Sequence, residues 1–200
     1  KRLKAHRFQQ FYAWFLYCLI TVAWFTKKDF IQLKRYKKKD LIKTQNTTYK
    51  KAFSRLVLAK IFYISFILIV PLIFSSQPLG LTLLFYFIMH FTSGVFISTI
   101  FQLAHVVSET DFPTPAVDGS IKNSWAAHQL YTTANFGKKN LPLSWFVGGL
   151  NFQIEHHLFP NICHVHYRKI SDIVKSTAQE FDLPYYQNTL FGAISSHTKH

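Results

Sequence analysis

The sequence predicts an all-α integral membrane protein, in which a transmembrane helical hairpin is joined to an interfacial helix and to a cytosolic helical cap. Aromatic side chains make up 18% of the 200 residues, which is rich for a soluble domain. Residues 61–104 contain no Asp, Glu, Lys or Arg, whereas 16 of the 23 Lys and Arg residues lie in residues 1–60. Because a helix crosses a bilayer with about 20 apolar residues, the uncharged stretch is long enough for two spans and a turn.

The hairpin is predicted over residues 56–74 and 79–104, with a short uncharged turn at 75–78. Pro71 near the end of the first span is tolerated in a membrane helix. Basic residues precede the first span and none occupies the turn, so the positive-inside rule places both flanks in the cytoplasm. The net charge of +14 would also suit a nucleic-acid partner. Bilayer binding explains the charge and the hydrophobic stretches together, so no nucleic-acid partner is expected.

Residues 11–25 form a third apolar segment, which predicts an interfacial or re-entrant helix. Fifteen helical residues reach about 22 Å, which is less than the roughly 30 Å of a hydrocarbon core. Basic residues flank the segment on both sides, and its Trp and Tyr side chains suit the head-group layer. The competing interpretation is a true third span.

Residues 105–200 are mixed in polarity and predict the cytosolic cap. The Pro and Gly content of residues 112–120 favours a loop. Helices are expected over residues 123–135, 144–158 and 170–181, the second introduced by Pro142 and ended by Pro160. The third of these segments has an amphipathic pattern, and the residues after it are expected to form a tail.

Residues 152–166 contain four histidines, two of them adjacent. On a helix, Gln153, His156 and His157 share one face, so two imidazoles and an amide carbonyl can converge on one point. Glu155 points elsewhere and is a candidate for orienting a metal ligand from outside the ligand shell. His105 follows the second span directly and lies on the same membrane face as this cluster by topology. The pattern predicts a metal site, and because imidazole suits Fe, Zn, Cu and Ni, the spacing does not choose the metal.

The remaining histidines have more ordinary explanations. His90 lies inside the second span and is expected to hydrogen bond to a neighbouring helix. His128 is a weaker candidate ligand, and so are the two histidines that follow Pro160. The others are expected to be solvated residues of the chain ends, namely His6, His197 and His200.

Five stretches occur in a defined order: HRFQQFYAWFLY (6–17), FQLAHVVSETDFP (101–113), HQLYTTANF (128–136), QIEHHLFP (153–160) and FPNICHVHY (159–167). The stretches are spread from residue 6 to residue 167, and the similarity that they carry extends over nearly the whole chain. The set resembles the front-end membrane fatty acid desaturases of the acyl-CoA or linoleoyl-CoA type, and QIEHHLFP is similar to their third histidine box. The resemblance implies that residues 1–200 are the C-terminal part of a single desaturase domain.

The resemblance also implies a centre of two iron ions bound mainly by histidines. His156 and His157 match ligands of the third box, and His105 matches an additional ligand after the hairpin. Gln153 stands where many relatives have histidine, so direct binding, binding through water and no binding all stay open. The first and second histidine boxes do not appear in residues 1–200. This chain alone is therefore expected not to desaturate any substrate.

The same resemblance implies O2 as co-substrate and electrons from an electron-transfer protein, ferredoxin or a b-type cytochrome. The implied substrate is a fatty acyl-CoA or an acyl-lipid. The implied location is the bacterial inner membrane, with the histidine site on its cytoplasmic side. Basic residues in 27–60 could attract the electron carrier or a CoA phosphate, although adhesion to the membrane is the preferred interpretation.

Three alternatives remain. A related di-iron lipid hydroxylase or sphingolipid-modifying enzyme would use the same chemistry. A non-enzymatic membrane metal-binding protein would need ligands between the spans, which offer only His90. A structural hairpin would carry its histidines incidentally.

Overall fold

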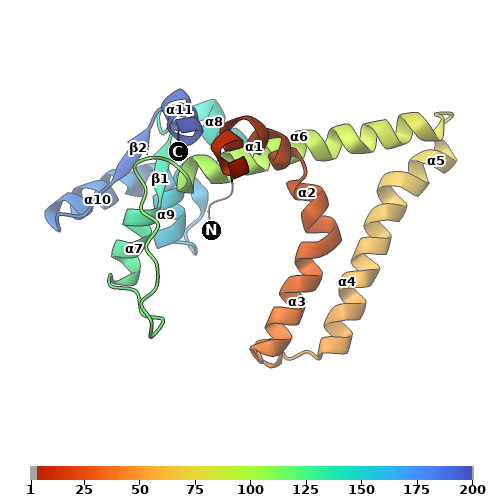
Figure 1. The fold of residues 1–200 in the computed structure, drawn as a ribbon, viewed down its shortest axis with the longest axis horizontal. Helices are drawn as coiled ribbons and strands as arrows, with labels where there is room; N and C mark the ends of the chain where they lie inside the picture. Colours follow the sequence, from red (N-terminus) through yellow and green to blue (C-terminus); the bar gives the residue numbers. More distant parts are fainter. Residues whose placement is uncertain (1–3, 200) are drawn as a thin grey trace. The chain divides into compact units, whose positions relative to one another are not determined.

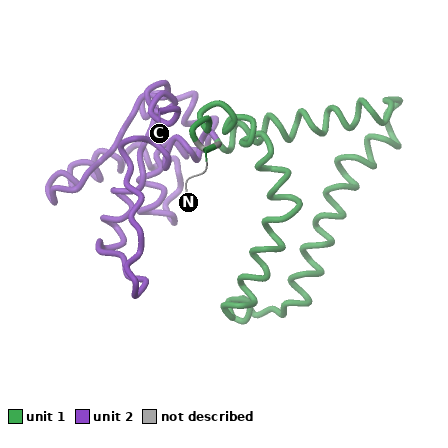
Figure 2. The backbone as a smooth tube through the Cα atoms, in the orientation of Figure 1, with its two compact units in different colours: residues 1–98 green, residues 99–200 purple. Residues whose placement is uncertain are grey.

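The computed structural model describes residues 4–199, apart from the side chains of residues 5 and 6 (Figure 1). The chain divides into two compact units, residues 1–98 and 99–200 (Figure 2). Nearly all of the regular structure described is helical, and the two strands are three residues each. The mainly helical class predicted from the sequence is therefore confirmed, with the correction that the second unit contains a small sheet.

The first unit begins with consecutive helical segments: a 3-10 turn at Lys4–Phe8, α1 at Gln9–Cys18, α2 at Ile20–Ala23, a π-helical turn at Trp24–Lys28, and α3 at Asp29–Lys38. The helix expected over 11–25 is thus part of a longer helical stretch that continues into the lysine-rich sequence. Its interfacial position remains a prediction.

Among the described residues, two helices are long and apolar enough to cross a membrane, Tyr49–Phe74 and Leu79–His105. The first comprises α4 at Tyr49–Ile64, a π-helical turn at Ser65–Ile69 and α5 at Val70–Phe74, and the second is α6. The two predicted apolar helices are therefore confirmed, although the first begins well before residue 56. The Thr48 side chain caps it by accepting a hydrogen bond from the Lys51 amide at 3.3 Å.

The π-helical turn lies directly before Pro71 for a physical reason. Proline has no amide hydrogen, and its ring crowds the carbonyl four residues earlier in a regular α-helix. A wider turn moves that carbonyl away and lets the helix continue.

Polar side chains make several of the contacts among the helices of the first unit. Lys60 in α4 forms an ion pair with Asp29 in α3, which lies beside it (Figure 1). The His90 ring in α6 is hydrogen bonded on both nitrogens, to the Tyr63 hydroxyl at 2.9 Å and to the Thr21 hydroxyl at 3.0 Å. The helix–helix hydrogen bond expected for His90 is therefore confirmed.

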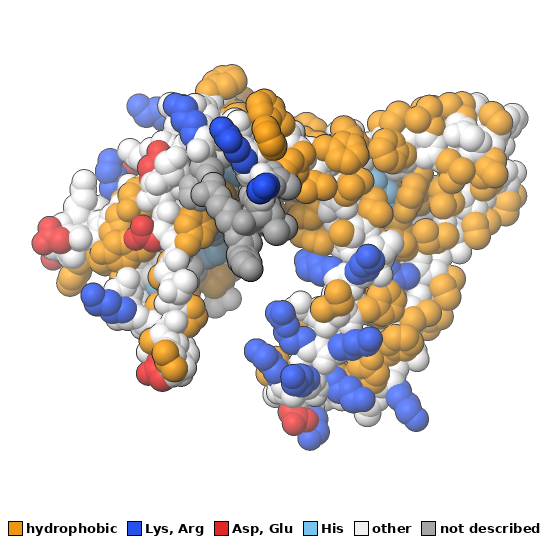
Figure 3. Space-filling view, in the orientation of Figure 1, with side chains coloured by type: hydrophobic (Ala, Val, Ile, Leu, Met, Phe, Trp, Pro, Cys, Tyr) orange, Lys and Arg blue, Asp and Glu red, His pale blue; other side chains and the backbone are white. Residues whose placement is uncertain are grey.

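Charge and hydrophobicity are separated along this unit. Figure 3 shows Lys and Arg side chains gathered over α3 and the beginning of α4, while hydrophobic side chains cover α5 and α6. Large apolar side chains of these helices are exposed, among them Phe62, Phe74 and Phe85. Such a surface is suited to lipid contact rather than to water.

Gly94 lies where the backbone of α6 packs closely against the end of α1. A Cβ atom at this position would lie 2.4 Å from the Cys18 carbonyl oxygen and 2.7 Å from that of Tyr17. Gly94→Ala is therefore expected to destabilise the full protein by about 1–3 kcal/mol through overpacking. Thermal unfolding in detergent measures this, with Gly80→Ala as the control because nothing lies within 4 Å of a Cβ at Gly80 in the same helix. Equal melting temperatures for the two variants would contradict the packing described.

The second unit carries the remaining elements. They are α7 (Trp125–Thr132), β1 (Ala134–Phe136), α8 (Leu141–Phe146), α9 (Gln153–Leu158), a 3-10 turn (His164–His166), α10 (Tyr167–Glu180), β2 (Tyr186–Asn188) and α11 (Leu190–Lys199). β1 and β2 pair in parallel, with Ala134 opposite Tyr186. One core cluster joins the end of α6 to β1 and α11 through Leu103, Phe136 and Ala193. A second joins α7, α9 and α10.

Two expectations for the second unit were wrong. The helix expected over 144–158 is divided into α8 and α9, because Gly148 and Gly149 adopt φ angles of 59° and 74°. This left-handed conformation favours glycine and ends the first helix. The expected tail instead forms β2 and α11. Ala193 in α11 is fully buried. The His197 ring in the same helix hydrogen bonds to the Val106 carbonyl at 2.6 Å, so His197 is not a solvated end residue.

The helix expected over 123–135 is confirmed only for residues 125–132, which form α7, because residues 134 and 135 belong to β1. Two further expectations agree with the structure. Residues 112–120 contain no helix or strand, and α10 covers the predicted amphipathic segment. His200 and the side chain of His6 lie outside the part of the chain that is described.

Candidate metal centre

Three of the predicted ligands lie close together in the second unit. His105 is the last residue of α6, whereas His156 and His157 lie in α9. The ring centroids of His105 and His157 are 4.9 Å apart, and those of His156 and His157 are 5.8 Å apart. The predicted proximity of His105 to the adjacent histidine pair is therefore confirmed.

Each of these three imidazoles is held by a hydrogen bond at its Nδ1 atom. The His105 Nδ1 lies 3.2 Å from the Thr132 carbonyl oxygen, and the His157 Nδ1 lies 2.8 Å from the Gln129 side-chain oxygen. These oxygens accept, so both Nδ1 atoms carry the hydrogen and both Nε2 atoms keep a free lone pair. The His156 Nδ1 lies 3.2 Å from the Tyr167 hydroxyl.

The Nδ1 contacts of these rings resemble those of metal-binding imidazoles. Imidazoles that bind metals usually donate their other N–H to a carbonyl, carboxylate or water, which fixes the ring orientation. Burial, followed by the neighbouring rings of His105 and His156, lowers the pKa of His157 to about 4. His157 is therefore neutral near pH 7, which is the form that binds a metal.

The environment of α9 explains how the pair is positioned. The Asn135 side-chain oxygen accepts a hydrogen bond from the Ile154 amide at 3.0 Å, which satisfies one of the free amides in the first turn of α9. The Asn135 amide group donates to the Glu155 carboxylate at 2.8 Å. β1 thus holds the start of the helix at two points.

Glu155 is fully buried and hydrogen bonds to Asn135 and Tyr185 rather than to the imidazoles. Its carboxylate accepts the hydrogen bond from the Tyr185 hydroxyl at 2.7 Å. Burial and the Glu155 charge both raise the pKa of Tyr185, so this hydroxyl stays protonated and remains a donor. The bonds that Glu155 makes fix α9 as a whole rather than one imidazole.

The other candidates occupy different surroundings. The Gln153 side chain is buried, and its amide nitrogen has no hydrogen-bond partner within the described residues. His128 lies in α7 beside Gln129, and its Nδ1 likewise has no partner among the residues that the structure describes. His164 and His166 are exposed. Within residues 4–199, no three His, Cys, Asp or Glu side chains are grouped closely enough to hold a metal ion as they stand.

The hydrogen-bond partners were not found from the sequence. Gln129, Thr132 and Tyr167 contact the three histidines from other elements, and spacing along the chain gives no signal for such contacts. Asn135 and Tyr185 were missed because the small sheet that carries or flanks them was not predicted.

The fold and this cluster define a helical membrane protein with a histidine-based candidate metal centre. The fatty acid desaturase family model matches residues 2–189, and the chain belongs to this family. The front-end resemblance is also supported, because relatives include enzymes named 6-desaturases and 5-desaturases. No solved structure matches this chain.

Relatives with curated names show how far the similarity extends. The chain is 38% identical over 187 residues to an sn-1 linoleoyl-lipid 6-desaturase of Synechocystis sp., which covers 90% of this chain and 50% of that protein. It is 41% identical over 146 residues to an acyl-lipid (8-3)-desaturase of Physcomitrium patens, which covers 70% of this chain and 29% of that protein. It is 33% identical over 192 residues to an sn-1 linoleoyl-lipid 6-desaturase of Arthrospira platensis, which covers 96% of this chain and 51% of that protein. The chain therefore spans about half the length of the two sn-1 linoleoyl-lipid 6-desaturases and less than a third of the Physcomitrium protein.

Proposed function

We propose that the full protein is an O2-dependent front-end desaturase of fatty acyl chains, and that His105, His156 and His157 bind iron in it through their Nε2 atoms. The observation that carries the proposal is the set of Nδ1 hydrogen bonds, which leaves the opposite nitrogens of neighbouring rings available. Family membership supports iron as the metal.

The role of this chain is to hold and orient ligands. Thr132 and Gln129 fix the tautomers of His105 and His157, and Asn135 fixes the helix that carries the pair. Bound iron and O2 would supply the oxidising power that removes two hydrogens from an unactivated acyl chain. His128 is proposed as a further ligand, because its buried Nδ1 atom has no partner among the described residues. Gln153 is proposed to bind through its side-chain oxygen, because it precedes His156 by one helical turn in α9.

The 200 residues supply too few ligands for two iron ions, so the rest of the ligand set is proposed to lie elsewhere in the protein. We therefore expect this chain alone to be inactive. An acyl-lipid is the proposed substrate because relatives are named as linoleoyl-lipid and acyl-lipid desaturases. The proposed electron donor is ferredoxin or a b-type cytochrome, and the proposed location is the cell membrane with the histidines on the cytoplasmic face.

The alternatives differ in what they predict. A metal carrier would need free ligands between the spans, yet both ring nitrogens of His90 are occupied by Tyr63 and Thr21. A hydroxylase would retain the same site and differ in its product.

Product analysis tests the proposed function. The full protein would be expressed in a host that lacks polyunsaturated lipids, supplied with linoleate, and its fatty acids analysed by mass spectrometry. We expect a new double bond between an existing one and the carboxyl end. A hydroxylated fatty acid as the product would show that the protein is a hydroxylase and not a desaturase. Unchanged fatty acids in cells that contain the folded protein would contradict both activities.

A further inference from the structure

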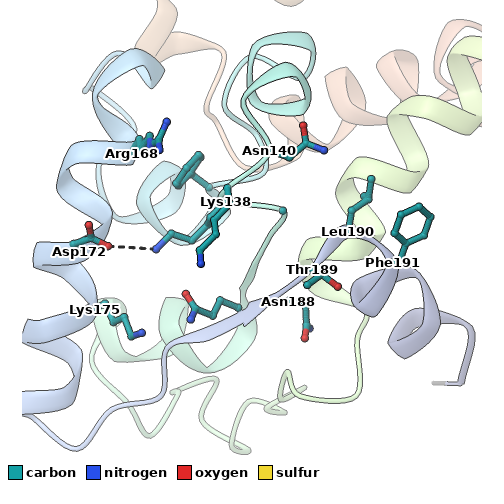
Figure 4. Close-up of a pocket in the computed structure, with 13 residues that line it drawn as sticks. Lys138, Asn140, Arg168, Asp172, Lys175, Asn188, Thr189, Leu190 and Phe191 are labelled. Atoms are coloured by element: carbon teal, nitrogen blue, oxygen red, sulfur yellow. Dashed lines mark ion pairs between the residues drawn. The ribbon is translucent and has the colours of Figure 1, made fainter.

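A cavity of about 790 Å³ lies in the second unit, away from the three imidazoles. Figure 4 shows how its labelled side chains are arranged. Arg168, Asp172 and Lys175 come from α10, Lys138 comes from the loop after β1, and Thr189 lies where β2 passes into α11.

The lining of the cavity is strongly basic although its unit is not. Residues 99–200 contain seven Lys and Arg residues and seven Asp and Glu residues. The cavity gathers four of those bases, Lys138, Lys139, Arg168 and Lys175, and one of the acids, Asp172. Such a concentration of one sign in a concave site attracts anions.

Most of this positive charge is not neutralised by the protein. Lys138 forms an ion pair with Asp172 at 3.8 Å. Among residues 4–199, no carboxylate lies within ion-pair distance of Lys139, Arg168 or Lys175. Three cations therefore remain available to an anionic ligand.

The volume indicates more than a simple ion. Cavities of roughly 300–1,000 Å³ accommodate organic ligands of moderate size. Amide side chains at Asn140 and Gln187 line the same cavity and add hydrogen-bonding groups, while the ring of Phe191 adds an apolar surface. An Arg and two Lys side chains are typical phosphate-binding groups.

We propose that this cavity binds a phosphate-bearing organic ligand, namely the polar carrier end of the acyl substrate. The identification of the ligand as the substrate's carrier rests on the proposed function, whereas phosphate binding does not. The cavity and the candidate metal centre share one packed body: Phe152 lines the cavity and directly precedes α9. Lys138 donates to the Tyr185 hydroxyl at 3.2 Å, and that hydroxyl donates to Glu155 at 2.7 Å.

Binding to the detergent-solubilised full protein tests the proposal without any turnover. Isothermal titration calorimetry would compare CoA, short-chain dihexanoyl phosphatidylglycerol and inorganic phosphate, with pantetheine as the phosphate-free control. The variant Arg168→Gln is matched by Lys169→Gln, which removes the same charge from the next residue of α10 but does not line the cavity. Lys139→Gln provides a second cavity variant at an exposed position.

We expect at least one of the phosphate compounds to bind, and pantetheine not to bind. Arg168→Gln and Lys139→Gln should each weaken binding about tenfold, as expected for a lost hydrogen bond to a charged group, and Lys169→Gln should change it less than about twofold. Binding of CoA alone identifies a nucleotide carrier, binding of the lipid alone identifies a phospholipid head group, and binding of inorganic phosphate alone reduces the site to a phosphate site and removes the carrier assignment.

Two results would overturn the proposal. One is no binding of any phosphate compound at millimolar concentration by folded protein. The other is equal weakening by Lys169→Gln and Arg168→Gln, because binding would then follow the overall charge of α10 and not the cavity. A protein that binds phosphate compounds through these residues but desaturates nothing would refute the proposed function and leave the site intact.

Discussion

His157→Ala in the full protein is expected to lower the amount of desaturated product by more than about 100-fold. His157 lies close to both of the other imidazoles, with its ring centroid 4.9 Å from that of His105 and 5.8 Å from that of His156. Its removal takes away a proposed iron ligand, which has a larger effect than the roughly 10–100-fold loss typical of residues that only orient a ligand. Fatty acid analysis by mass spectrometry of cells that express equal amounts of each protein measures the effect.

His164→Ala is the matched control for this experiment. His164 belongs to the same histidine-rich stretch, but its side chain is exposed. Its Nδ1 atom lies 3.9 Å from the Cys163 sulfur, which is a weak contact. Activity of His164→Ala is therefore expected to stay within about twofold of the wild type. Full activity of a folded His157→Ala protein would contradict the proposed ligand set.

Tyr185→Phe is expected to destabilise the protein by about 2 kcal/mol, which is typical of a lost hydrogen bond to a charged group. The Tyr185 hydroxyl donates to the buried Glu155 carboxylate at 2.7 Å. It also lies 2.8 Å from the Asn135 amide nitrogen and 2.9 Å from the Ser171 hydroxyl. Without this hydroxyl, a fully buried carboxylate loses one of its two donors. Thermal unfolding of the detergent-solubilised full protein measures the loss.

Tyr186→Phe removes the same hydroxyl from the next residue and provides the control. Within the described part of the chain, the Tyr186 hydroxyl has no hydrogen-bond partner, so its loss is expected to cost less than about 0.5 kcal/mol. Because the Tyr185 network holds α9, iron retention should also fall in Tyr185→Phe and not in Tyr186→Phe. Equal melting temperatures and equal iron contents would show that the network does not support the helix.

The elements predicted well are those whose signal is local. α6 was predicted from a long uncharged run of residues, and α10 was predicted from an amphipathic pattern. Each of these signals lies within the helix that it predicts. The division between α8 and α9 was missed because apolar residues continue on both sides of Gly148 and Gly149, although two adjacent glycines indicate a break. β1 and β2 were missed because each has only three residues, and their pairing joins positions far apart in the sequence.

The site was predictable to a similar degree. The position of His105 at the end of an apolar helix and the spacing within α9 were enough to bring His105, His156 and His157 together. Their partners could not be predicted, because Gln129 and Tyr167 reach the rings only through tertiary packing. Glu155 was expected to support a single ligand, whereas its hydrogen bonds to Asn135 and Tyr185 support the whole helix.

Metal analysis of the purified full protein tests the central claim most directly. If these imidazoles bind iron, the wild-type protein should contain about two iron ions per chain, because a metal that binds only the folded site is retained through purification. The double variant His105→Ala/His157→Ala should lose most of that iron while it remains folded and bound to the membrane. Iron content that is unchanged in the double variant, or absent from an active wild-type protein, would contradict the account.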